Sequence, residues 1–215
     1  MTMEPTIKYK YPRTYHLPWS PGLKNDDRRI PSVEQFYDKE VVVTLKMDGE
    51  NTSIYPDTIH ARSLEKEYHE SRNWVNKLQG NIGYLLNENE RICGENVAAH
   101  HSIRYKGLDN FFYVFSYWIG GVCQSWDDTV KRCKELGLAM VPVLYRGLWD
   151  DEKIKACHQD TYQGNEMEGY VVRTAEGFHY DKAFFSQLAK YVRDDHVQTD
   201  EHWKKKPVSW NGWTL

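Results

Sequence analysis

The segment KMDGEN, residues 46–51, holds the residue types best suited to chemistry in this chain. It follows residues 41–45, a run of mostly β-branched residues that predicts a buried strand. We expect the stem of Lys46 to lie against apolar side chains, where burial and nearby cations lower the pKa of its amine. Asp48-Gly49 predicts a sharp turn, because glycine adopts backbone angles that other residues resist. The segment therefore predicts a nucleophilic lysine that attacks phosphorus or a carbonyl carbon.

Four later stretches place a carboxylate, an aromatic ring or a cation at or beside a predicted strand. Each also has an ordinary structural explanation. Glu95 fits an exposed strand bulge, and Phe115 fits a buried core position. Glu168 fits a turn, and Lys190 fits a solvated edge strand. A four-residue KxDG match is weak evidence by itself, so the order and spacing of all the stretches must decide.

In chain order, these stretches resemble motifs of the covalent nucleotidyltransferase superfamily, which includes the ATP-dependent ligases and the mRNA capping enzymes. The resemblance covers about two-thirds of the chain, from Lys46 to Arg193, and it is nearest to compact phage- or bacterium-like ATP-dependent RNA ligases. It implies an α+β, ATP-grasp-like nucleotidyltransferase fold. The supporting stretches are KMDGEN, HARS, ICGENVAAHHSIRY, FYVFSYW, MEGYVVR and AKYVR.

The resemblance implies a role for each matched residue. Lys46 would attack the α-phosphorus of ATP to form lysyl-AMP, with Lys190 on the α-phosphate and Glu168 as a further catalytic residue. AMP would then pass to a 5′-phosphate end of RNA, and a 3′-hydroxyl would displace it. The nucleotide-binding set is Lys46, Asp48, Gly49, Glu95, Phe115 (stacked on adenine), Glu168 and Lys190. The RNA-binding set is Asn51, Arg62, Arg104 and Arg193.

Charge balance adds a divalent metal to the expected cofactors. Glu95, which by resemblance holds the ribose or the metal, and Glu168 would repel a triphosphate unless a cation lay near them. We therefore expect ATP together with Mg²⁺, or Mn²⁺ in its place. His100 and His101 are less suited to bind metal, since adjacent residues of a strand face opposite ways.

The last motif departs from the family pattern, which often reads Lys-x-Lys. Here Val192 stands two places after Lys190, and Arg193 comes one residue later. Strand alternation predicts that Arg193 faces away from Lys190 unless a bulge turns it inward. Either such a bulge brings Arg193 inward as the second cation, or the second cation is missing.

The elements that must position these residues are many short strands and few helices. Such a pattern predicts an α+β fold with antiparallel sheets flanked by helices, and no Rossmann or P-loop glycine motif is present. Strands are expected over residues 40–45, 51–55, 58–62, 91–97, 111–118, 140–145, 169–173 and 188–193. Helices are expected over residues 32–37, 70–86, 127–136 and 150–160.

The chain of 215 residues predicts one main domain. We expect an irregular N-terminal arm over residues 1–31, a nucleotidyltransferase domain over 32–195 and a tail over 196–215 that contains Lys204–Lys206. Only 22 residues follow Arg193, too few for an OB-fold domain. Four scattered cysteines and no long apolar run indicate a soluble cytoplasmic protein, expected as a monomer, with no protein partner indicated.

Three alternatives to an RNA ligase stay open. The first is a DNA ligase, and the second is a GTP-using capping guanylyltransferase. The third is a relative that binds RNA but has lost catalysis. The expected absence of an OB-fold domain and the likeness of the motifs to those of RNA ligases argue against the first two. The presence of Lys46, both glutamates and Lys190 argues against the third.

Overall fold

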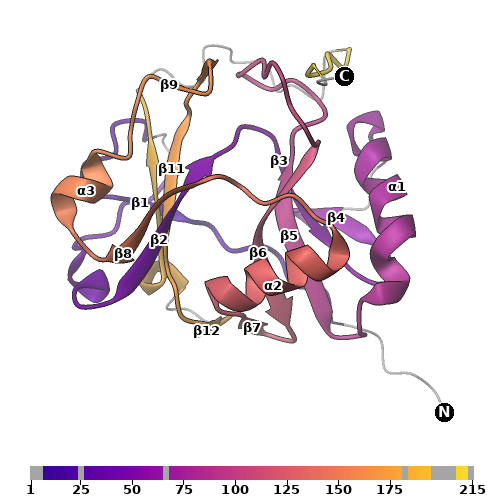
Figure 1. Ribbon diagram of the computed structural model, residues 1–215, viewed down its shortest axis with the longest axis horizontal. Coiled ribbons are helices and arrows are strands. Elements are labelled where there is room, and N and C mark those ends of the chain that lie inside the picture. The colour runs from indigo at the N-terminus through magenta and orange to yellow at the C-terminus, as the bar shows by residue number, and fades with distance from the viewer. Residues whose placement is uncertain (1–6, 24–26, 65–67, 181–183, 195–206, 213–215) are drawn as a thin grey trace.

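Most strands of the computed structural model belong to two sheets that lie side by side (Figure 1). The structure describes residues 7–23, 27–64, 68–180, 184–194 and 207–212. The first sheet has the strand order β1-β13-β11-β2-β8 and is antiparallel except where β1 pairs with β13. Its strands are β1 (Tyr15–His16), β2 (Glu40–Lys46), β8 (Val143–Leu148), β11 (Gly169–Thr174) and β13 (Leu188–Val192).

The second sheet is antiparallel throughout, in the order β12-β7-β6-β5-β3-β4. A separate hairpin joins β9 (Thr161–Tyr162) to β10 (Asn165–Glu166). The strands of the second sheet are β3 (Glu50–Ile54), β4 (Ile59–Ala61), β5 (Glu90–Asn96), β6 (Phe112–Ile119), β7 (Val122–Cys123) and β12 (Phe178–His179).

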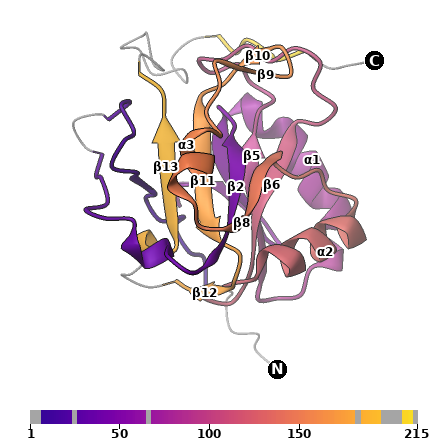
Figure 2. The ribbon, with the colours of Figure 1, turned by 60° about the vertical axis from the view of Figure 1, so that its left-hand side comes forward.

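Two longer helices lie against the second sheet, while a short third helix lies beside the first sheet (Figures 1 and 2). α1 (Asn73–Ile82) and α2 (Trp126–Leu136) bury apolar side chains together with those of β3, β5 and β6. Ser125 caps the start of α2, and Gly137 ends it in the left-handed conformation with φ 66°. The remaining helices are α3 (Asp151–Lys155) and the 3₁₀ turns Glu34–Phe36, Glu70–Arg72, Gly83–Leu85 and Phe184–Ser186.

The strand β2 is buried at the centre of the first sheet and leads directly to the second. Val41, Val42 and Val43 have no solvent exposure, so both faces of the strand are covered, as the β-branched run predicts. β2 ends at Lys46 and β3 begins at Glu50, so a three-residue turn joins the two sheets. The predicted lysine therefore lies where the two sheets meet.

The predicted α+β fold with antiparallel sheets is confirmed, with differences in particular elements. The strand expected over 140–145 instead starts at Val143, because Pro142 has no N–H to donate to a ladder. The helix expected over 150–160 is limited to α3. The two-residue strands β1, β7, β9, β10 and β12 are too short to produce an alternating pattern in the sequence.

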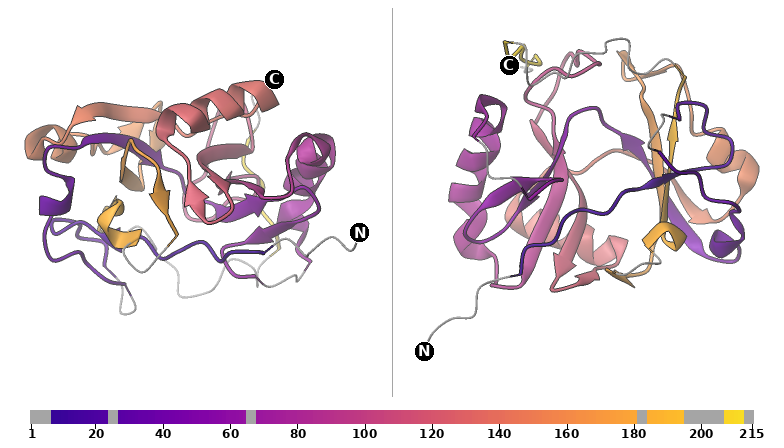
Figure 3. Two further views of the ribbon diagram at one scale, coloured as in Figure 1. Left: turned by 90° about the horizontal axis from the view of Figure 1, so that it is seen from below. Right: turned by 180° about the vertical axis from the view of Figure 1, so that it is seen from behind.

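Residues 7–23 run behind both sheets and are packed against them (Figure 3). Tyr11 is buried in a cluster with Trp118 and Phe184, and Leu17 is fully buried in the main core. β1 then adds an edge strand parallel to β13. The N-terminal segment, here residues 7–23 and 27–31, thus forms part of the folded core. Near the other end, Asn211 is buried against residues 97–99, while Lys204–Lys206 lie outside the described residues.

Candidate active site

Lys46 lies at the wall of a cavity of about 610 Å³ between the two sheets. The cavity is lined by the ends of β2 and β3, by β5, β6, β11 and β13, and by residues 10–14 of the N-terminal segment. Such a volume suits a nucleotide-sized ligand. The predicted site residues that line it are Lys46, Gly49, Asn51, Arg62, Glu95, Phe115 and Lys190.

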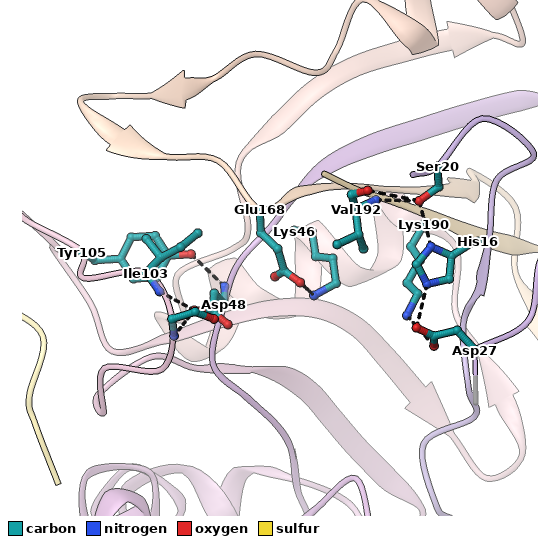
Figure 4. Close-up of polar contacts among 11 residues, drawn as sticks. His16, Ser20, Asp27, Lys46, Asp48, Ile103, Tyr105, Glu168, Lys190 and Val192 are labelled. Carbon is teal, nitrogen blue, oxygen red and sulfur yellow. Dashed lines mark hydrogen bonds and ion pairs between the residues drawn. The ribbon is translucent and has the colours of Figure 1, made fainter. Parts of the chain in front are cut away.

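The Lys46 amine is hydrogen bonded to Glu168, which immediately precedes β11 (Figure 4). The sheet register explains the contact, because Lys46 is directly opposite Gly169. A side chain at Gly169 would not fit, since its Cβ would lie 2.0 Å from the Tyr191 carbonyl oxygen. The close passage of β11 along β13 therefore needs a glycine beside Glu168.

The charge state of Lys46 differs from the prediction. Burial lowers the pKa of Lys46, but the carboxylates of Glu168 and Glu95 raise it by more, and the net pKa lies above its ordinary value. The predicted depression of this pKa is wrong. Residues 122 positions apart are brought together here, and their negative charge outweighs the effect of burial. At neutral pH the amine is an ammonium group that must lose a proton before it can attack phosphorus.

Glu95 on β5 shares this charged region. Burial raises its pKa to about 8, with Lys46 opposing the rise and Glu168 adding to it. Oxygen ligands of this kind suit Mg²⁺ or Mn²⁺, and a cation would relieve the repulsion between the carboxylates. Within the described residues no group of three or more His, Cys, Asp or Glu side chains is arranged to hold a metal. Metal binding by the two glutamates stays a prediction, in which phosphate and water would supply the other ligands.

Asp48 and Gly49 shape the turn after Lys46. The Asp48 carboxylate accepts hydrogen bonds from the backbone N–H groups of Ser102 and Ile103, each 2.7 Å long. The Asp48 N–H donates to the Tyr105 hydroxyl at 2.7 Å (Figure 4). Asp48 is thus buried and faces a loop, away from the cavity lining.

Gly49 is required for a different reason from the one predicted. Among the described glycines, those with positive φ are at other positions. A Cβ at Gly49 would instead lie 2.4 Å from the Asn96 carbonyl oxygen. Close approach to β5, and not an unusual backbone angle, excludes a side chain here.

Lys190 lies on β13, and a carboxylate from the N-terminal segment contacts it (Figure 4). Its Nζ is 3.3 Å from Asp27 Oδ1, and Asp27 Oδ2 is 3.1 Å from Nε2 of the buried His16. Burial and then Lys46 lower the pKa of Lys190, while Asp27 opposes them. Asp27 and His16 were not predicted, because no sequence motif links them to a strand more than 160 residues away.

Phe115 lines the cavity and packs edge-on against Tyr11, with ring centroids 5.3 Å apart. This places an aromatic face between the N-terminal segment and β6. Stacking on adenine stays a prediction for this ring. Tyr11 of the N-terminal segment also lines the cavity.

The predicted RNA-binding residues fall into two groups. Asn51 and Arg62 line the cavity, and Asn51 is directly opposite Glu95 on the neighbouring strand. Arg104 and Arg193 lie outside the lining: Arg104 donates to Ser209 Oγ at 2.7 Å, and Arg193 donates to Glu166 at 2.5 Å. Since β13 ends at Val192, Arg193 does not join Lys190 as a second cation.

The two histidines expected on a strand follow an isolated bridge at Ala99 and lie outside the named strands. His101 lines the cavity, while His100 does not. Separately, none of the helices in the described ranges is long and apolar enough to cross a lipid bilayer.

Comparisons with known proteins show that this chain shares its fold with solved ligase structures. An RNA ligase mutant of Naegleria gruberi with ATP and Mn is 19% identical, with a TM-score of 0.58, over 89% of this chain and 61% of that one. A putative ATP-dependent DNA ligase of Aquifex aeolicus is 19% identical, with a TM-score of 0.55, over 86% of this chain and 50% of that one. The chain thus spans about half to three-fifths of these proteins, and at such low identity the likeness shows a shared fold.

A search of curated proteins gives no significant match. The family model described as RNA ligase matches residues 39–192, well over half of the chain, and this range includes every strand that lines the cavity. The chain therefore belongs to the RNA ligase family.

Proposed function

We propose that this chain is an ATP-dependent RNA ligase that joins 5′-phosphate and 3′-hydroxyl ends through a lysyl-AMP intermediate. The observation that carries the proposal is Lys46 beside Glu168 at the wall of a nucleotide-sized cavity, with Glu95, Phe115 and Lys190 along the same lining. Membership of the RNA ligase family supports it. The solved relative with ATP and Mn supports both expected cofactors.

In the first step, neutral Lys46 Nζ attacks the α-phosphorus of ATP. An N–P bond forms, the bond from the α-phosphorus to the bridging oxygen breaks, and pyrophosphate leaves. The Lys190 ammonium offsets negative charge that develops on the α-phosphate oxygens. The Lys46 proton must leave first, since the amine is an ammonium group at neutral pH.

The second and third steps use the same cavity. A 5′-phosphate oxygen of RNA attacks the phosphorus of lysyl-AMP, and Lys46 is released. A 3′-hydroxyl then attacks the 5′-phosphorus, and AMP leaves. Each step is a displacement at phosphorus, so one set of positioned charges serves all three. Asn51 and Arg62 are the residues of the lining that we propose for the RNA strand.

Glu95 and Glu168 are the residues we propose to hold the divalent metal. A cation bound there would neutralise charge on the triphosphate and on both carboxylates. Burial and Glu168 raise the pKa of Glu95 to about 8. A bound cation would favour the ionised form of this carboxyl group.

We further propose the ATP-grasp-like form of this fold for the two sheets, with residues 32–195 as the nucleotidyltransferase domain acting as a monomer. Residues 1–31 and 196–215 would flank that domain.

A DNA ligase is a second candidate, because the putative DNA ligase of Aquifex aeolicus shares the fold at a similar TM-score. The substrate assay below separates the two.

Incubation with [α-³²P]ATP and Mg²⁺ tests the proposal. Wild-type protein is expected to gain a covalent label that is absent from Lys46→Ala and from protein incubated with [γ-³²P]ATP. Lys77→Ala is a matched control, since Lys77 is an exposed residue of α1. No label with any nucleotide would overturn the enzyme function.

Labelled protein is then offered single-stranded RNA, nicked duplex RNA and nicked duplex DNA, each with a 5′-phosphate. Sealing of RNA is expected. Sealing of DNA alone would favour the second candidate, while label from GTP but not ATP would indicate a capping guanylyltransferase.

A further inference from the structure

Asp27 is the central residue of a polar chain that ends at Lys190. Its Oδ1 lies 3.3 Å from Lys190 Nζ, and its Oδ2 lies 3.1 Å from His16 Nε2. The other ring nitrogen of His16, Nδ1, lies 2.8 Å from Ser20 Oγ. Figure 4 shows the side chains in this order on one side of Lys46. One carboxylate therefore bridges a fully buried histidine and a cation of the cavity wall.

The same segment also fixes the backbone of β13. His16 is paired with Lys190 in the sheet, and Leu17 N–H donates to the Lys190 carbonyl at 2.8 Å. The Val192 N–H donates to Ser20 Oγ at 2.9 Å. The backbone of Lys190 is thus held by His16 and Leu17, and its side chain is held by Asp27. Val192, two residues after Lys190, has an apolar side chain. The charged partner that contacts Lys190 is instead Asp27, from a distant part of the chain.

The charges around Lys190 explain why a carboxylate is useful there. The groups that face it are Lys46 of β2, Glu168 before β11, and Asp27 and His16 of the N-terminal segment. Burial and Lys46 both disfavour its ammonium form. His16 is uncharged at neutral pH, because burial and then Lys190 lower its pKa to about 4. Asp27 is the contacting group of opposite charge, and its contact leaves protons of the ammonium for another acceptor.

We propose that Asp27 is a positioning residue that holds the Lys190 ammonium at the cavity wall for the α-phosphate of the nucleotide. The N-terminal segment is then part of the active site through this carboxylate. The inference rests on the proposed function. Asp27 acts through Lys190 and need not touch the nucleotide.

The rate of lysyl-AMP formation under single turnover, measured across ATP concentrations, tests the inference. Asp27→Asn keeps the shape but removes the charge, and it is expected to lower the maximal rate roughly tenfold, as loss of a charge-assisted contact does. Asp27→Glu is expected to restore part of that rate. Asp160→Asn, a change of the same kind at an exposed position outside the lining, is expected to match wild type.

A double-mutant cycle separates positioning from a structural role. In a Lys190→Ala background, Asp27→Asn is expected to have no further effect. The same cycle is measured on the Kd for ATP with Mg²⁺ in Lys46→Ala protein, which cannot react, so a low rate does not hide the result. The midpoint of thermal unfolding is recorded for every variant to identify any that fail to fold.

Equal losses from Asp27→Asn with and without Lys190 would overturn the inference, as would a rate equal to that of Asp160→Asn. In both cases wild-type protein still forms lysyl-AMP, so the proposed function stands. Absence of the adduct from wild-type protein would instead overturn the proposed function, and this inference with it.

Discussion

The surroundings of Lys46 raise the pKa of its amine, whereas the surroundings of Lys190 lower the pKa of its amine. Lys46 contacts Glu168 and lies near Glu95 and Asp48, and these carboxylates raise its pKa in spite of burial. Lys190 contacts Asp27, but burial and the charge of Lys46 outweigh it and lower its pKa. Two lysines on neighbouring parts of one sheet are thus tuned in opposite directions by the partners that the fold supplies.

The opposite pKa shifts bear on the different roles proposed for the two lysines. The nucleophile that we propose must be deprotonated to attack, yet the carboxylates around Lys46 raise its pKa and favour its ammonium form. A phosphate-binding residue must stay charged, yet Lys190 is the one whose proton is more weakly held. For Lys190, the carboxylate of Asp27 opposes the fall in pKa and so favours the charged form.

Substituting arginine for each lysine in turn is expected to produce the largest difference in activity between the two positions. Lys46→Arg is expected to give no covalent AMP, a loss of more than about 10³-fold, because a guanidinium group does not deprotonate. Lys190→Arg keeps the charge and is expected to lose less than Lys190→Ala, which removes an electrostatic donor that typically contributes ~10²-fold. Quantified AMP label over time provides the measurement. Equal losses at both positions would contradict their different roles.

Asp48→Ala tests the Lys46 side through stability. The substitution leaves the N–H groups of Ser102 and Ile103 without the carboxylate that accepts from them. We expect the free energy of unfolding to fall by about 3 kcal/mol, as two buried charge-assisted hydrogen bonds are lost. Urea denaturation followed by tryptophan fluorescence measures the change. Asp48→Asn keeps an acceptor and should lose less; an identical loss would argue against this explanation.

His16 tests the Lys190 side through pH. Its pKa in the folded protein is about 4, below its ordinary 6.5, so the unfolded chain takes up a proton first as the pH falls. The stability that His16 contributes is present above pH 6.5 and is lost toward pH 4, at about 1.4 kcal/mol per pH unit. Urea titrations at several pH values should give a shallower decline for His16→Gln than for wild type. Parallel curves would show that His16 titrates normally.

Glu168→Gln tests the cause of the raised pKa of Lys46, and its expected effect is the smallest of the four. Removing the carboxylate that raises the pKa of Lys46 the most is expected to move that pKa downward. Modification of Lys46 by a lysine-selective reagent in metal-free buffer should then begin at lower pH, as measured by peptide mass spectrometry. Lys77, exposed on α1, serves as the internal reference. An unchanged onset at Lys46 would contradict the cited cause.

The sequence predicted the elements around Lys46 well because their signals are local. The β-branched run before Lys46 is a buried strand, and the helix expected over residues 127–136 is α2, which spans Trp126–Leu136. Its predictions were weaker where a short element depends on distant partners. β1 has two residues and exists only because β13 lies beside it. Pro142 delays β8, a boundary that strand propensity alone did not reveal.

Residue types and their order determined that this chain carries a lysine after a buried strand, two glutamates beside glycines, and a later lysine in the pattern of the RNA ligase family. Only the tertiary structure decided the charge on each lysine. Electrostatic effects depend on distance in space and on burial, and Glu168 and Asp27 reach their partners across more than 100 residues of chain. For the same reason the sequence did not reveal that the N-terminal segment contacts Lys190.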